Sequence, residues 1–163
     1  MNSPLTIRSA TPADVPALFS LIQALADYEK LSDAVIGSPE QLADHLFGVR
    51  PYIEAIVADR ASQVVGFALF FHNYSTFLTK PGIYLEDLFV LSEHRDQGIG
   101  KALLAHLAQL VIDRDCGRLE WSVLDWNEPA IGFYKRMGAT VLPDWRTCRV
   151  TGDALTLMAQ QND

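Results

Sequence analysis

A glycine-rich stretch combines backbone and side chains that could bind an anion. Residues 95–101 run Arg-Asp-Gln-Gly-Ile-Gly-Lys, and an apolar helical stripe begins within them. Gly98 and Gly100 lack Cβ atoms, so a ligand can come close to the backbone there. The first N–H groups of a helix have no intrahelical partner, and together with the helix dipole and Lys101 they attract negative charge. The stretch therefore predicts a site for phosphate or pyrophosphate.

Two familiar phosphate loops are excluded by single positions. A Walker A loop needs a Gly five residues before its Gly-Lys pair and a Ser or Thr after it, where this chain has Arg95 and Ala102. A dinucleotide fingerprint needs a third Gly at the position of Leu103. The pattern that stands is Arg-x-x-Gly-x-Gly, and by itself it leaves an ordinary strand–turn–helix corner as the alternative.

The predicted loop requires a strand before it and a helix after it. Residues 84–90 alternate and are rich in aromatic and branched side chains, which predicts a strand. Residues 99–112 place apolar side chains on one helical face. These are Ile99, Leu103, Leu104, Leu107, Leu110 and Val111.

The remaining pattern predicts an α/β fold in a single domain over residues 1–163. Further strands are expected at residues 5–9, 53–60, 64–74 and 118–126, with a last one at 145–150. Further helices are expected at residues 12–28, 39–47 and 128–137, while 153–160 fits a helix or a strand. This order of elements predicts a mixed sheet with helices on both faces.

Several separated motifs resemble one superfamily. The Arg-x-x-Gly-x-Gly loop, residues 84–87, 125–129 and 133–136 are similar to the GNAT acetyltransferases, in particular to the spermidine/spermine branch. Residues 28–33 and 124–127 are most similar to the thialysine acetyltransferases of that branch. The resemblance runs from about Ile7 to about Trp145. It implies a sheet whose fourth and fifth strands splay apart, with acetyl-CoA entering the gap.

Acetyl transfer to an amine poses two proton problems, and the resemblance assigns a residue to each. A lysine-like ammonium has a pKa of ~10.4 and cannot attack until it loses a proton. A departing thiolate, with a thiol pKa of ~8.5, gains from a proton donor. The resemblance implies Glu86 as the base and Tyr134 as the acid. Asp87 is expected on the opposite strand face from Glu86, because side chains alternate, unless the strand bulges.

The resemblance also implies two sets of binding residues. The acetyl-CoA set is Leu88, Phe89, Val90, Arg95, Asp96, Gln97, Gly98, Ile99, Gly100, Lys101, Asn127, Glu128, Pro129 and Ala130. The amine set is Tyr28, Glu29, Glu86, Asp87, Glu120, Trp121, Ser122 and Asp144. For Arg95 two roles stay open, since it could support the loop or reach a phosphate.

The composition restricts which partners and ligands the protein is expected to bind. The net charge of −7 argues against nucleic acid and against an anionic membrane surface, and it suits a cationic substrate. No apolar stretch approaches the ~18 residues of a membrane span, so we expect a cytoplasmic protein. Cys116 and Cys148 have no metal or redox spacing, and the four histidines are scattered, so no metal is expected.

The sequence therefore predicts an acetyl-CoA-dependent N-acetyltransferase that acts on a small cationic primary amine. The amine would attack the thioester directly in a ternary complex. Thialysine, lysine-like amino acids, diamines and polyamines remain open as substrates. The alternatives are a protein or peptide amino-group acetyltransferase and a non-catalytic acyl-CoA-binding module. The resemblance further implies a homodimer.

Overall fold

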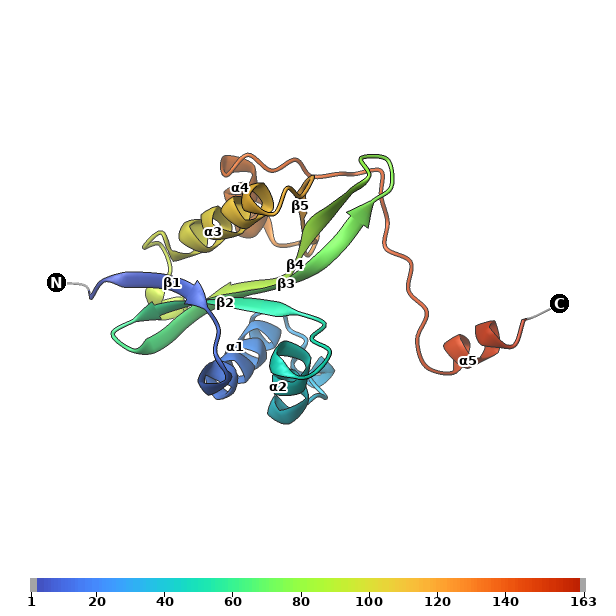
Figure 1. Ribbon diagram of the computed structural model, residues 1–163, viewed down its shortest axis with the longest axis horizontal. Coiled ribbons are helices and arrows are strands. Elements are labelled where there is room, and N and C mark those ends of the chain that lie inside the picture. The colour runs from blue at the N-terminus through green and yellow to red at the C-terminus, as the bar shows by residue number, and fades with distance from the viewer. Residues whose placement is uncertain (1–2, 162–163) are drawn as a thin grey trace. The chain divides into compact units, whose positions relative to one another are not determined.

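The computed structural model describes residues 3–161 (Figure 1). The chain forms two compact units, Met1–Ser122 and Val123–Asp163. The first unit contains the whole sheet and the second contains two helices. The prediction of one domain stays a prediction.

The first unit is built on a five-stranded sheet with the strands in sequence order. The strands are β1 (Leu5–Ser9), β2 (Glu54–Arg60), β3 (Gln63–Ser75), β4 (Lys80–Val90) and β5 (Leu119–Glu120). Neighbours from β1 to β4 are antiparallel, and β5 runs parallel to β4. A parallel neighbour requires a crossover, and α3 (Ile99–Asp113) provides it between β4 and β5. The predicted mixed sheet is confirmed.

A two-residue turn connects β2 to β3. Ala61 and Ser62 both have positive φ angles, 53° and 63°, as a type I′ turn requires. The two strands therefore form a hairpin, and the turn residues themselves contain no glycine.

Helices cover both faces of this sheet (Figure 1). The helices α1 (Val15–Tyr28) and α2 (Pro39–Phe47) lie against one face, and α3 lies against the other. The core on the α1 side contains Leu18, Leu21 and Leu46 from the helices and Val57, Phe67, Leu69 and Phe89 from the strands. Outside this cluster, Ile83 and Leu85 of β4 and Leu103 and Leu107 of α3 are also fully buried. This packing holds β4 between the two helical layers.

Three single-turn 3₁₀ helices interrupt the connections of the first unit. They are η1 (Pro12–Asp14), η2 (Ser32–Ala34) and η3 (Ser92–His94). The first precedes α1, so the helix expected from residue 12 begins in the α conformation only at Val15. The second follows α1 directly, and the third leads from β4 into the glycine-rich stretch.

The second unit contains α4 (Glu128–Arg136) and α5 (Asp153–Ala159). Asn127 precedes α4, and its side-chain oxygen accepts a hydrogen bond of 3.4 Å from the N–H of Ala130. This contact is a helix N-cap, which explains why α4 begins here.

Two strand predictions were wrong. Residues 145–150 have no regular structure, because a strand needs a hydrogen-bonded partner and sequence alternation does not supply one. Residues 118–126 form a strand only at Leu119 and Glu120, the two positions that pair with β4. The segment that fitted either state, residues 153–160, is helical as α5.

Candidate active site

The strand β4 is paired differently along its two halves. On one side it pairs with β3 from Lys80 to Val90. On the other side it pairs with β5 only at Ile83 and Tyr84. From Leu85 to Val90, the outer edge of β4 therefore has no strand neighbour among the described residues. This pattern matches the predicted splaying of the fourth and fifth strands.

Glu86 is an extra residue in this strand. Asp87 lies opposite Leu69, and Leu85 lies opposite Phe70, so the residue between them has no partner on β3. Such a β-bulge interrupts the alternation of faces and can re-aim a side chain. Glu86 is exposed, whereas Leu85 is buried and Asp87 is partly buried. The prediction that Asp87 and Glu86 lie on opposite faces allowed for a bulge in the strand. The structure has that bulge, at Glu86.

Glu86, Asp87 and Glu29 form an acidic cluster in the first unit. Burial, followed by the negative charges of Glu86 and Glu29, raises the pKa of Asp87 to about 6. Burial also raises the pKa of Glu29. Glu29 reaches the cluster because it is the C-terminal cap of α1, where its N–H bonds to the Leu25 carbonyl. The charges of Glu86 and Glu29, which lie on two separated segments, thus act on Asp87.

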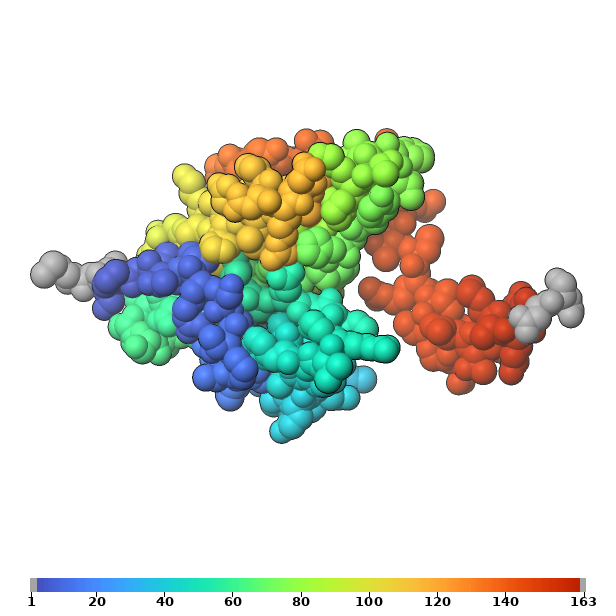
Figure 2. All heavy atoms as spheres, viewed as in Figure 1, coloured from blue at the N-terminus to red at the C-terminus, as the bar shows by residue number. Residues whose placement is uncertain are grey.

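The glycine-rich stretch forms an exposed turn that opens α3, coloured yellow in Figure 2. Gly98 is the N-cap with φ of 80°, in the left-handed region that favours glycine. A Cβ built on Gly98 would meet no heavy atom within 4 Å, so the space beside it is open. The N–H of Ala102 bonds to the Gly98 carbonyl at 3.0 Å. The N–H groups of Ile99, Gly100 and Lys101 lie before that first bond and can meet an anion.

Two side chains of this stretch contact protein groups. The amide oxygen of Gln97 accepts a hydrogen bond from Arg60, at the end of β2. The Nε of Arg95 donates to the Val90 carbonyl at 3.1 Å. The Arg95 guanidinium carbon lies 4.9 Å from the ring centre of Tyr28 and 5.4 Å from that of Phe89. These contacts fit the first of the two roles predicted for Arg95, and the choice between the two roles stays a prediction.

Among the predicted substrate residues at 120–122, Glu120 and Ser122 have side-chain contacts with β3 and β4. Glu120 accepts from the Nε of Arg118 at 2.8 Å and from the amide of Asn73 at 3.3 Å. Ser122 lies 2.9 Å from the hydroxyl of Tyr84, with either oxygen able to donate. Trp121 between them is partly buried. The Glu120 carboxylate is thus already balanced by a cation.

The other predicted site residues lie in the second unit. Asn127 is buried and caps α4, while Glu128 and Pro129 are exposed in its first turn. Tyr134 lies on the same helix and is partly buried, with its ring centre 5.5 Å from that of Phe133. Asp144 is exposed in the segment between α4 and α5.

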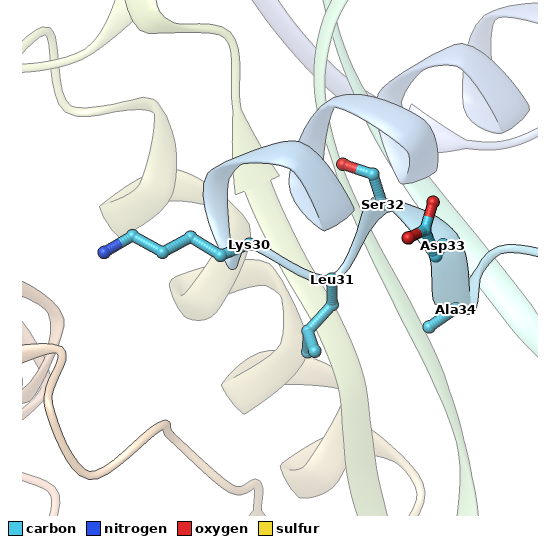
Figure 3. A pocket seen from close by; sticks show the side chains of 5 residues that line it. All are labelled: Lys30, Leu31, Ser32, Asp33 and Ala34. Atoms are coloured by element: carbon cyan, nitrogen blue, oxygen red, sulfur yellow. The ribbon is translucent and has the colours of Figure 1, made fainter.

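The segment after α1 lines an open hollow of about 440 Å³ that the sequence did not predict as a pocket. Its lining residues are Lys30, Leu31, Ser32, Asp33 and Ala34 (Figure 3). Lys30 extends away from Ser32 and Asp33 in this view. The residues that line the hollow directly follow Glu29 in the chain. They include the cationic Lys30 and the anionic Asp33.

Residues 3–161 lack two features that would change the kind of site. No group of three or more His, Cys, Asp or Glu side chains there is arranged to hold a metal ion. No helix in the same range has the length and apolar character needed to cross a membrane.

The chain is similar to known acetyltransferases. Residues 20–139 match the acetyltransferase (GNAT) family. An L-ornithine N5-acetyltransferase of Arabidopsis thaliana is 35% identical, over 96% of this chain and 88% of its own length. A thialysine N-epsilon-acetyltransferase of Bos taurus is 38% identical, over 94% and 96%. An integron cassette protein from Vibrio cholerae has a similar structure, with a TM-score of 0.79 and 28% identity over 96% of this chain and 98% of that one.

The family match and the named relatives define an acyltransferase that acts on an amine. The chain belongs to the acetyltransferase (GNAT) family, and it is an N-acetyltransferase. The predicted resemblance to the thialysine acetyltransferases is confirmed.

Proposed function

We propose that this protein transfers an acetyl group from acetyl-CoA to the terminal amine of a small amino acid such as thialysine or a lysine-like compound. The observation that carries the proposal is the acidic cluster of Glu29, Glu86 and Asp87 beside the open edge of β4. A cationic amine would enter this cluster because the carboxylates attract it. The amine would then attack in a ternary complex with both substrates bound.

Glu86 is the proposed base. The bulge presents it as an exposed carboxylate between the buried Leu85 and the partly buried Asp87. It would take the proton of the substrate ammonium, directly or through water, and so produce the neutral amine that can react. Asp87 would hold the cationic end of the substrate through its charge.

The first unit has features that fit acetyl-CoA. The open space beside Gly98 and the first N–H groups of α3 suit a pyrophosphate. The outer edge of β4 from Leu88 to Val90 would offer backbone groups to the pantetheine arm. When bound, acetyl-CoA supplies the acetyl thioester that acylates the amine.

Tyr134 is the proposed acid, and Asn127 to Ala130 are the proposed cofactor residues of the second unit. A phenol with a pKa of ~10 is a suitable proton donor to a sulfur of similar basicity. Its assignment rests on the family pattern around α4, since Tyr134 belongs to the second unit and Glu86 to the first.

Three observations favour an amino acid over a long polyamine. The acidic cluster is compact, whereas a polyamine carries several cationic centres and would need acidic residues along an extended groove. The hollow after Glu29 has both Lys30 and Asp33 in its lining, which could meet the α-carboxylate and the α-ammonium of an amino acid. The names of the two relatives also refer to amino acids with a terminal amine.

A competition assay tests the substrate class. Thialysine, ornithine and spermidine are mixed at equal concentration with acetyl-CoA and enzyme, and the acetylated products are measured by mass spectrometry. We expect a higher kcat/KM for the amino acids, by a modest factor because one exposed ion pair contributes only ~0–1 kcal/mol. Dominant acetylspermidine would assign the protein to the polyamine enzymes. Acetyl-CoA binding without release of free CoA in any mixture would indicate a non-catalytic binding module.

The Tyr134→Phe variant tests the proposed acid. It keeps the ring and removes only the hydroxyl, so we expect turnover to fall ~10²-fold while the affinity for acetyl-CoA changes little. Turnover is measured at saturating substrates and affinity by calorimetry. Phe133→Leu is the matched control, because it alters the neighbouring ring without removing a proton donor. Equal turnover in wild type and Tyr134→Phe would exclude the hydroxyl as the acid of a rate-limiting step.

The family resemblance also leads us to propose a homodimer. Sedimentation equilibrium of the purified protein would test this directly, since a mass near the 18.1 kDa of one chain would contradict it.

A further inference from the structure

Arg95 contacts three residues in two separate parts of the first unit, α1 and β4. Its Nε donates to the carbonyl of Val90, at the end of β4. Its guanidinium carbon lies 4.9 Å from the ring centre of Tyr28, the last residue of α1, and 5.4 Å from that of Phe89. Because Arg95 itself begins the glycine-rich stretch, these contacts connect that stretch to α1 and β4.

The distances are those of genuine interactions. A guanidinium within about 6 Å of an aromatic ring centre is attracted by the electron-rich face. Arginine is also suited to combine such contacts with a hydrogen bond, because its guanidinium is planar and carries donors in fixed directions. The exposed position of Arg95 makes each contact modest, but the three act on one side chain.

The residues that Arg95 contacts are close in the chain to members of the acidic cluster. Tyr28 is followed directly by Glu29, whose charge contributes to the raised pKa of Asp87. Phe89 and Val90 lie two and three positions after Asp87 on β4. Arg95 therefore holds together the two chain segments that bring Glu29 and Asp87 into electrostatic contact.

Arg95 is less suited to neutralise the negative charge of the acidic cluster. The charges that shift the pKa of Asp87 belong to Glu86 and Glu29, and both raise it, whereas a cation acting on Asp87 would lower it. Arg95 thus acts on the cluster through the position of α1. Its contacts with Val90 and the two rings also direct the guanidinium toward protein groups.

We propose that Arg95 is a positioning residue for the amine site, and that its side chain is not a phosphate ligand. We call the contacts of Arg95 with Tyr28, Phe89 and Val90 the Arg95 bridge. The bridge fixes the last turn of α1 against the end of β4, and so sets the separation of Glu29 from Asp87. This inference rests on the proposed function for its effect on the amine, but the contacts themselves do not.

The first test separates amine binding from cofactor binding. The Arg95→Gln variant should raise the KM of the amine about five- to tenfold, the loss expected for two cation–π contacts and one hydrogen bond. The Kd of acetyl-CoA, measured by calorimetry, should change less than twofold. Arg50→Gln is the matched control, because it removes one exposed cation from the connection between α2 and β2. A fall of tenfold or more in acetyl-CoA affinity with an unaltered amine KM would overturn the proposal.

A double-mutant cycle tests whether Arg95 acts through Tyr28. Tyr28→Leu removes the ring, and we expect the Arg95→Gln/Tyr28→Leu protein to be little worse than either single variant. Tyr28→Phe keeps a ring for the guanidinium and should raise the amine KM less than Tyr28→Leu does. Effects of Arg95→Gln and Tyr28→Leu that simply add would show independent roles and would contradict the bridge.

Amide hydrogen exchange provides a measurement that needs no turnover. The N–H groups of Glu29, Lys30 and Leu31 bond to the carbonyls of Leu25, Asp27 and Ala26. In Arg95→Gln these three amides should exchange several times faster than in wild type, while the Arg50→Gln control should not differ. Unchanged exchange would overturn the bridge. A wild-type protein that acetylates no amine would refute the proposed function, and the exchange rates would still decide whether the bridge exists.

Discussion

The two halves of β4 differ in pairing, burial and charge. The first half, from Lys80 to Tyr84, pairs with β3 and meets β5 at Ile83 and Tyr84. The second half pairs with β3 alone, contains the bulge at Glu86 and leads through η3 to the glycine turn. Each half belongs to the same continuous strand. With the proposed function, the difference means that one strand is a structural support over part of its length and a proposed binding edge over the rest.

Deleting one residue from each half should separate these roles, with the largest expected effect. Deletion of Glu86 leaves Leu85 opposite Phe70 and Asp87 opposite Leu69, so both keep their faces and the strand can remain paired. We expect a folded protein with turnover reduced about 10³-fold, because the proposed base is missing.

Deletion of Ile83 is the matched comparison. It removes a fully buried residue that pairs on both sides, and it shifts the following or preceding residues to the wrong face. We expect no cooperative folding transition by circular dichroism. A Glu86 deletion that retains turnover within about tenfold of wild type would remove Glu86 from the mechanism. A Glu86 deletion that unfolds like the Ile83 deletion would show that the bulge is structural.

Substitutions at Gly98 and Gly82 give a second comparison, between an effect on acetyl-CoA affinity and an effect on stability. Gly98→Val should raise the Kd of acetyl-CoA about 10- to 100-fold. The new side chain fills the open space beside the turn, and positive φ costs roughly 1–2 kcal/mol outside glycine. Gly82→Ala, in the paired half, would place its Cβ against the side-chain oxygen of Asn73 and 3.2 Å from the Arg118 carbonyl.

The Gly82→Ala variant should therefore lose stability by about 1–3 kcal/mol, and its folded fraction should bind acetyl-CoA normally. Thermal unfolding and calorimetry on both variants measure the two quantities. Normal acetyl-CoA binding by folded Gly98→Val would contradict the pyrophosphate assignment.

The smallest expected effect is a pH-dependent stability that originates at Asp87. Its pKa of about 6 in the folded protein lies above the ordinary value of 3.8. The folded state therefore holds this proton more tightly than the unfolded state, and stability falls as the pH rises from about 4 to about 6. Above about pH 6, Asp87 is ionised in both the folded and the unfolded protein, and stability falls no further from this group.

Asp87→Asn removes this loss of stability. We expect the variant to be more stable than wild type by about 1 kcal/mol at pH 8, less than the shift alone implies because solvent reaches the cluster. The difference should vanish near pH 4. Urea unfolding at pH 4, 6 and 8 measures it, and a constant difference across the three values would show that the effect does not come from ionisation.

The periodic elements around β4 could be predicted from the sequence, because their apolar patterns are long and their ends are marked. The stripe from Ile99 to Val111 predicted α3, and Asn127 before Pro129 marked the start of α4. The glycine-rich turn was also predicted from the sequence, and in the structure Gly98 has a positive φ.

The pairing of β4 could not be predicted in the same way. Alternation in residues 84–90 does not show which residue is extra, because a bulge is defined by the partner strand. The same reason explains the errors at residues 118–126 and 145–150, whose alternation was read without knowledge of a neighbouring edge. Glu29, Glu86 and Asp87 were assigned to the amine set by the family resemblance. Their spacing in the chain does not show that α1 and β4 bring Glu29 near Asp87.

The open edge of β4 also bears on self-association. An exposed strand edge can accept a strand from another molecule and so begin aggregation. Here the bulge disturbs the regular spacing of backbone groups, and Glu86 and Asp87 place negative charge where a second strand would pair. Two copies brought edge to edge would oppose like charges at this position. The residues proposed to handle the amine would therefore also keep the strand from polymerising.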